Sequence, residues 1–318
     1  MKHFSSSELK TIIHSKRANL YYLEHCRVLV NGGRVEYVTE EGAQSLYWNI
    51  PIANTTCMLL GTGTSITQAA MRELGKAGVS VGFCGGDGSP LYTAGEMQCD
   101  ISWMSPQSEY RPTEYLQQWA SFWFDDEKRF QAAILFQNQR IKEISKHWKV
   151  LEKECSLDLE ELSAILETSQ SDLLACSSQT EILSVEARMT KKLYRQIAQS
   201  VGYGSFTRAK QGTGIDLANK YLDHGNYLAY GLAATTCWVL GLPHSLAVLH
   251  GKTRRGGLVF DVADIVKDAL VLPQAFIGAM EGDSPQEFRQ RCLSNLRKAN
   301  ALDVMIETVQ ATAKTVSK

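Results

Sequence analysis

The sequence changes character at residues 105–112, which read Ser-Pro-Gln-Ser-Glu-Tyr-Arg-Pro. Two prolines within eight residues resist helix continuation, so this stretch is predicted to be a linker. Before it, short β-rich runs alternate with turn residues, and after it nearly every segment has helical periodicity. The chain of 318 residues is therefore predicted to be an α+β protein of two domains: a small β-rich domain at residues 1–105 and a larger all-α domain at residues 106–318.

The first half contains a hairpin signal and a helix signal. Residues 20–30 and 34–39 are rich in strand-forming types and flank the turn Asn-Gly-Gly at residues 31–33, where Asn-Gly favours the positive φ angles of a tight turn. Further along, Ser65 with a glutamine three residues later predicts the start of a short helix. Gly78 is predicted to end that helix before another strand.

The second half is predicted to be helical throughout. A period of 3.6 residues predicts helices at residues 114–149, 182–201, 218–240, 262–272 and 285–309, with an acidic segment at residues 151–184. The apolar run at residues 227–242 is shorter than the ~20 residues that span a bilayer, so we expect a buried core helix and no membrane segment. Eight cysteines without a Cys-x-x-Cys pair, and no signal peptide, favour reduced thiols in a cytoplasmic protein.

Charge is balanced overall but unevenly distributed. Lys and Arg total 33 against 34 Asp and Glu, a net charge of −1, which is not typical of a protein that binds nucleic acid through bulk charge. Residues 186–255, however, contain ten basic and three acidic residues. This window predicts a basic face for phosphate groups, with an ordinary solvated helix surface as the alternative.

Glu186 stands in the middle of an apolar stripe. On a helix, Ile182, Met189, Leu193 and Ile197 lie within about 60° of it. An unpaired charge in that position is costly, so the carboxylate needs a cation, a metal or a proton as its partner.

A second acidic group follows at residues 260–268. Asp261, Asp264 and Asp268 are spaced to share one helix face, where like charges repel. A bridging divalent ion would relieve that repulsion, and an acidic first turn favoured by the helix dipole is the alternative. Just before this group, His250 ends an apolar run. With Glu186 and Asp264 it would form a set of one imidazole and two carboxylates, which suits Mn²⁺ or Mg²⁺.

Four features together resemble one family: Glu186, residues 222–227 (Leu-Asp-His-Gly-Asn-Tyr), residues 241–250 (Gly-Leu-Pro-His-Ser-Leu-Ala-Val-Leu-His) and residues 260–264 (Phe-Asp-Val-Ala-Asp). They resemble the CRISPR-associated integrase that captures new spacers, the first-numbered Cas protein. The amino-acid sequence at residues 9–22 and 28–37 resembles the type I-F branch of this family in particular. At residues 222–226 the chain departs from the Leu-Asn-Tyr-Gly-Tyr of many relatives, so no side-chain role is transferred there.

The resemblance implies a β-rich N-terminal domain that forms a homodimer and a helical domain that binds Mg²⁺ or Mn²⁺. It implies that Glu186, His250 and Asp264 are the metal ligands, and that Asp261 lies nearby and is needed for catalysis. It also implies double-stranded DNA, both prespacer and CRISPR repeat, as the substrate. The implied partner is the family's small ferredoxin-like protein, which in the type I-F branch is fused to the helicase-nuclease.

The implied function is that of a metal-dependent DNA integrase and endonuclease, which inserts captured fragments into a CRISPR array by attack of a 3′-hydroxyl on a phosphodiester. Lys252, Arg254 and Arg255 are predicted to contact DNA phosphates. Two alternatives stay open: a metal-dependent repair nuclease that does not integrate, and a non-catalytic DNA-binding scaffold. A carboxylate in an apolar stripe argues against the scaffold.

Overall fold

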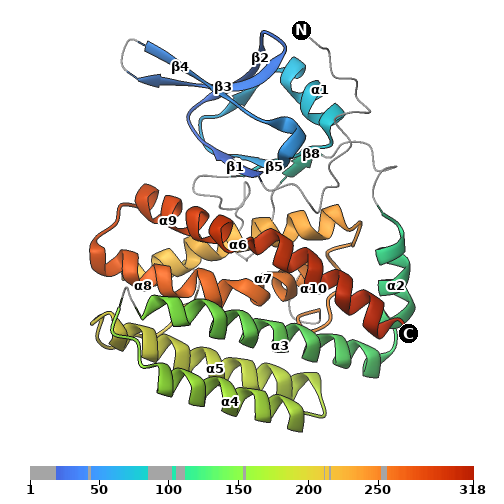
Figure 1. Ribbon diagram of the computed structural model, residues 1–318, viewed down its shortest axis with the longest axis vertical. Coiled ribbons are helices and arrows are strands. Elements are labelled where there is room, and N and C mark those ends of the chain that lie inside the picture. Colours follow the sequence, from blue (N-terminus) through green and yellow to red (C-terminus); the bar gives the residue numbers. More distant parts are fainter. Residues whose placement is uncertain are drawn as a thin grey trace. The chain divides into compact units, whose positions relative to one another are not determined.

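The computed structural model describes residues 19–41, 44–84, 102–104, 112–152, 155–210, 212–214, 216–251 and 256–318. The chain divides into two compact units, Met1–Arg111 and Pro112–Lys318. Strands dominate the first unit and helices make up the second, which confirms the predicted α+β class (Figure 1). The predicted linker lies outside the described residues except for Pro112, and the roles assigned to the two domains stay predictions.

The described part of the first unit consists of two four-stranded sheets, one α-helix and a short 3₁₀ helix at Ile52–Asn54 (Figure 1). One sheet has the order β1 (Asn19–Leu23), β5 (Thr55–Leu60), β7 (Ser80–Phe83), β8 (Ser102–Met104). The other has the order β4 (Gln44–Asn49), β3 (Arg34–Glu41), β2 (Arg27–Asn31), β6 (Ser65–Ile66). In the first sheet β1, β5 and β7 run parallel; in the second, β2, β3 and β4 form an antiparallel meander.

The predicted hairpin is present, but its first strand is shorter than expected. Residues 20–30 are divided between β1 and β2, which belong to different sheets, and His25 between them has a φ of 47°. In the hairpin, Asn31 pairs with Arg34, and Gly32 and Gly33 have φ angles of 54° and 79°. The glycine pair therefore forms the turn, and the asparagine remains in the strand.

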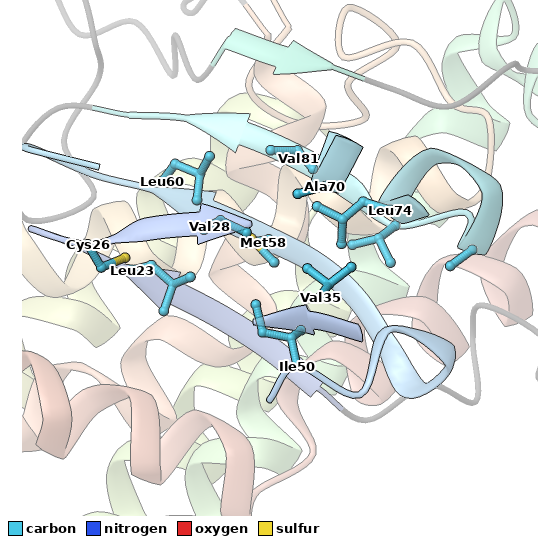
Figure 2. Close-up of a cluster of buried hydrophobic side chains, with 12 residues drawn as sticks. Leu23, Cys26, Val28, Val35, Ile50, Met58, Leu60, Ala70, Leu74 and Val81 are labelled. Atoms are coloured by element: carbon cyan, nitrogen blue, oxygen red, sulfur yellow. The ribbon is translucent and has the colours of Figure 1, made fainter. Parts of the chain in front are cut away.

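Helix α1 (Gln68–Ala77) begins at Thr67, not at the predicted Ser65. The Thr67 hydroxyl accepts the backbone N–H of Ala70, while Ser65 lies in β6 and pairs with β2. Gly78 ends the helix in the left-handed conformation, as predicted. Strands of both sheets and α1 bury one shared core, drawn in Figure 2, which contains these side chains: Leu23, Cys26, Val28, Val35, Ile50, Met58, Leu60, Ala70, Leu74, Ala77, Val79 and Val81.

The described part of the second unit is helical: α2 (Glu114–Trp123), α3 (Asp126–Leu151), α4 (Leu159–Ala175), α5 (Gln179–Ser200), α6 (Leu217–Val239), α7 (Gly257–Leu270), α8 (Leu272–Glu281), α9 (Pro285–Lys298) and α10 (Ala301–Val316). Two predicted helices are each divided in two. Asp125 accepts the backbone N–H groups of Glu127 and Lys128 and so starts α3 anew. Asn300, with a φ of 51°, separates α9 from α10.

Helix α7 lies at the centre of this unit. All of its residues except Lys267 are buried, and it contacts α3, α6, α8, α9 and α10 (Figure 1). Helices α4 and α5 pack against each other and against α3. Most of the apolar run at residues 227–242 lies within α6 and is buried there; among the described helices, none is long and apolar enough to cross a bilayer. This arrangement brings α3, α5 and α7 together.

Gly225 allows α6 to pack closely against the start of α8. A Cβ at this position would lie 2.4 Å from Cγ1 of the buried Val271. Gly225→Ala is therefore expected to cost about 1–3 kcal/mol through overpacking and to lower the melting temperature by several degrees in thermal unfolding followed by circular dichroism. Gly75→Ala in α1, where nothing lies within 4 Å, is the control and should leave the temperature unchanged or slightly raised. An unchanged temperature for Gly225→Ala would contradict this close packing.

Candidate metal centre

Glu186 lies on the buried side of α5, as the helical period predicts. Ile182 and Met189 beside it are buried, whereas the Glu186 side chain is 14% exposed. Its Oε1 is 2.9 Å from Nη1 of Arg140 on α3. Its Oε2 is buried without a hydrogen-bond partner among the described residues and lies 3.9 Å from Nε2 of His250. The sequence left a cation, a metal or a proton as the possible partner of Glu186. The structure shows that a cation, Arg140, pairs with Oε1, while Oε2 has no hydrogen-bond partner among the described residues.

Asp261 holds His250 in one orientation. The Asp261 Oδ1 is 2.7 Å from Nδ1 of His250 and accepts the backbone N–H of His250 at 3.0 Å. Its Oδ2 accepts the backbone N–H groups of Val248 at 2.7 Å and Leu249 at 3.0 Å. Because a carboxylate only accepts, Nδ1 carries the proton of the neutral ring and Nε2 keeps the lone pair. This is the tautomer that binds a metal through Nε2.

Asp264 completes a group of three ligands. It lies one turn after Asp261 on α7, is 3% exposed, and forms an ion pair with Lys267. One ligand atom each from Glu186, His250 and Asp264 lie within 4.8 Å of one another. Helix α5, the segment before α7 and α7 itself thus each supply one member of the group.

This donor set fits a divalent cation. Two carboxylate oxygens and one imidazole nitrogen are ligands that Mg²⁺ and Mn²⁺ accept. A buried carboxylate oxygen without a donor, such as Oε2 of Glu186, is costly unless a cation reaches it. Among the described residues, four carboxylates face two cations, which leaves two negative charges, the charge of one divalent ion: Glu186, Asp261, Asp264 and Asp268 against Arg140 and Lys267.

The negative charge around the three ligands favours positive charge at this place, either a proton on His250 or a metal ion. Burial lowers the pKa of His250. The hydrogen bond to Asp261 and the charges of neighbouring carboxylates raise the pKa by more than burial lowers it, so that it lies above its usual value. Burial raises the pKa of Asp264, and the charges of Lys267 and Arg140 outweigh this effect, so that the pKa falls to about 2. Asp264 is therefore ionised at neutral pH.

The structure does not bring the three aspartates of α7 together as a group of ligands for one ion, contrary to the first explanation given for their spacing. Asp261 accepts three backbone N–H groups, Asp264 pairs with Lys267, and Asp268 pairs with Arg140. Their mutual repulsion is relieved by separate partners. A helix-dipole effect does not account for them either, since Asp268 lies near the C-terminal end of α7.

Arg140 is the residue that sequence reasoning missed. It is 1% exposed and pairs with both Glu186 and Asp268. The signal was available, because Phe136 and Ile144, one turn away on either side, are apolar and buried. The argument that identified Glu186, a charge within an apolar stripe, applies equally to Arg140.

Two other predicted regions have different outcomes. Lys252, Arg254 and Arg255 lie outside the described residues, so their phosphate contacts stay a prediction. In the segment that departs from the family pattern, Asp223 forms an ion pair with Arg208 and accepts the backbone N–H of Gly212 at 2.8 Å. Asp223 therefore ties the segment after α5 to α6.

Comparisons with known proteins agree with this fold. The family model described as CRISPR associated protein Cas1 matches residues 20–277. The protein named CRISPR-associated endonuclease Cas1 from Pectobacterium atrosepticum is 66% identical over 99% of this chain and 98% of its own length. The protein of the same name from Pseudomonas aeruginosa is 62% identical, with the same coverage of 99% and 98%. A solved structure of a CAS1 protein from Thermotoga maritima is 15% identical, covers 94% of this chain and 97% of that chain, and has a TM-score of 0.69, which shows a common fold.

The family match extends over most of the chain and includes all three candidate ligands, Glu186, His250 and Asp264. The two relatives with identities above 60% match almost end to end. The chain therefore belongs to the Cas1 family of CRISPR-associated proteins.

Proposed function

We propose that Glu186, His250 and Asp264 hold one divalent ion, Mg²⁺ or Mn²⁺, and that the chain uses it to cut and join DNA. The chain is a CRISPR-associated endonuclease and DNA integrase of spacer acquisition. One observation above all supports the site: three ligand atoms from distant segments lie within 4.8 Å of one another. One of these residues, Glu186, also has a buried oxygen, Oε2, that has no hydrogen-bond donor among the described residues.

The proposed reaction is transesterification. The 3′-hydroxyl of a captured fragment attacks a phosphodiester of the repeat: a new P–O bond forms, the P–O bond to the leaving 3′-oxygen breaks, and the hydroxyl proton ends on the leaving oxygen. When bound, a divalent ion would neutralise charge on the non-bridging oxygens and favour ionisation of the nucleophile. Glu186 and Asp264 supply charged ligand oxygens, while Asp261 keeps the His250 ring in its metal-binding tautomer. Water in place of the hydroxyl gives cleavage.

The DNA contacts and assembly belong to the same proposal. Lys252, Arg254 and Arg255 would contact phosphates of double-stranded prespacer and repeat DNA, in keeping with the basic excess of residues 186–255. The β-rich unit would form the homodimer. The small ferredoxin-like partner, fused to the helicase-nuclease, would complete the assembly.

Chelation tests the proposed reaction. The chain, with and without its proposed partner, is incubated with a labelled DNA duplex that carries 3′-hydroxyl ends and a leader–repeat target. Joined product is expected with Mg²⁺ or Mn²⁺, and at least a hundredfold less with EDTA, because the ligands then hold no ion (an order of magnitude set by metal-ion catalysis). Cleavage without joining would indicate a repair nuclease. If the chain gives neither cleaved nor joined DNA, and EDTA does not change its binding to DNA, the result would indicate a non-catalytic scaffold.

A further inference from the structure

Arg140 joins the three helices that build the metal centre. From α3, its Nη1 lies 2.9 Å from Oε1 of Glu186, and its Nη2 donates to Oγ1 of Thr190 at 2.9 Å, both on α5. Its Nε donates to Oδ2 of Asp268 on α7 at 3.1 Å, and Nη2 contacts the same oxygen. Nη1 also lies 3.4 Å from Oε1 of Gln137. The guanidinium is therefore held on every side, at 1% exposure.

We propose that Arg140 is a positioning residue, which fixes the Glu186 carboxylate with Oε2 turned toward His250 and so sets the affinity of the centre for its divalent ion. This inference rests on the proposed metal site. Arg140 contacts Oε1, whereas Oε2 has no hydrogen-bond donor among the described residues and lies 3.9 Å from Nε2 of His250, so Oε2 is the oxygen better placed to act as a ligand.

A cation beside a metal ligand has two opposing effects. It orients the carboxylate, which strengthens ion binding, and it offsets the negative charge, which weakens ion binding. Here the positive charge is shared: Nε and Nη2 of Arg140 both contact Asp268. The pair of Arg140 and Asp268 is neutral as a unit, so Glu186 keeps its charge for the ion, and orientation is the larger effect.

Only arginine can fill this role. The planar guanidinium presents its N–H groups in several fixed directions, whereas the ammonium of lysine is a single point charge. One ammonium does not reach Glu186, Thr190 and Asp268 from the same position. Without its arginine, the Glu186 side chain would have to be ordered by the incoming ion, at a cost in affinity.

A double substitution separates orientation from charge. Arg140→Met with Asp268→Leu removes one cation and one carboxylate, so the net charge near the ion is unchanged. Apolar residues of similar volume in place of a buried ion pair generally preserve the fold. The dissociation constant for Mn²⁺, measured by calorimetric titration of the metal-free protein, is expected to rise roughly tenfold or more, the usual effect of losing a partner of a metal ligand.

A matched control is available on α5 and α4. Arg188 and Asp172 form an ion pair whose side chains are 57% and 41% exposed. Arg188→Met with Asp172→Leu makes the same chemical changes away from the ligands and is expected to leave the Mn²⁺ dissociation constant unchanged.

Arg140→Lys retains the charge and is a second variant in case the double substitution fails to fold. We expect a severalfold rise in the Mn²⁺ dissociation constant and an equal rise in the Mn²⁺ concentration that gives half-maximal DNA cleavage. A lower melting temperature with unchanged Mn²⁺ affinity would overturn the inference and leave Arg140 a structural residue. Wild-type protein that binds no Mn²⁺ would instead overturn the proposed site itself.

Discussion

His250→Ala is expected to lower DNA cleavage and integration by about a thousandfold or more while the fold and DNA affinity are retained. The substitution removes the only nitrogen among the three ligands, and stabilisation by a metal ion contributes several kcal/mol, at about 1.4 kcal/mol per factor of ten. The fold should survive, because Asp261 still accepts the three backbone N–H groups of residues 248–250. Rates, circular dichroism and DNA binding are measured on the same preparation.

His147→Ala is the matched control for this experiment. His147 lies on α3, where its Nε2 is 3.2 Å from Oε2 of Glu143, and it belongs to neither the ligand set nor the Arg140 contacts. Activity of this variant should equal that of the wild type. If His250→Ala still joins prespacer to repeat DNA in the presence of Mn²⁺, the assignment of the three ligands is wrong.

Asp261→Asn is expected to have the second largest effect, on ion affinity and stability together. One acceptor oxygen becomes an NH₂ group that must face either the N–H groups of Val248 and Leu249 or the ring of His250. Loss of the ring contact should weaken Mn²⁺ binding about 10–100-fold, because the orientation and tautomer of His250 are no longer set. Loss of the backbone contacts leaves buried donors unsatisfied, at about 1–3 kcal/mol each.

The two effects are separated by measuring Mn²⁺ affinity, cleavage rate and thermal unfolding on the same protein. Asp172→Asn on the exposed side of α4 is the control, and a change of less than about 0.5 kcal/mol is expected there. Wild-type Mn²⁺ affinity in Asp261→Asn would mean that Asp261 does not set the orientation of His250.

The fold class could be predicted from the sequence because its signals are local. Gly78 ends α1 because a glycine readily adopts the left-handed conformation, which is a property of that single residue. The period of 3.6 residues likewise identifies the helices from neighbouring residues alone. The errors arose where a long-range contact chose between local options. Ser65 and Thr67 are both suitable caps, but Ser65 pairs with β2 and Thr67 caps the helix. The break between β1 and β2 depends on the two strands joining different sheets.

In the candidate site, too, local sequence signals predicted some features and long-range contacts decided the others. A charge within an apolar stripe pointed to Glu186, and the spacing of Asp261 and Asp264 put both on one face of α7. The partners of these charges were not predictable in this way. Asp268 meets Arg140 across 128 residues of chain, and nothing in the local pattern of either helix names the other.

The sequence by itself determined the two-part α+β organisation and the residues with the chemistry to bind a divalent ion, because both depend on residue type and short-range spacing. Only the tertiary structure decided which charges meet. The packing of α3, α5 and α7 directs one oxygen of Glu186 to Arg140 and the other toward His250, and it separates the aspartates of α7 among different partners. Such pairings depend on contacts between segments that are distant in the sequence. Burial makes these contacts specific, and no local sequence pattern encodes them.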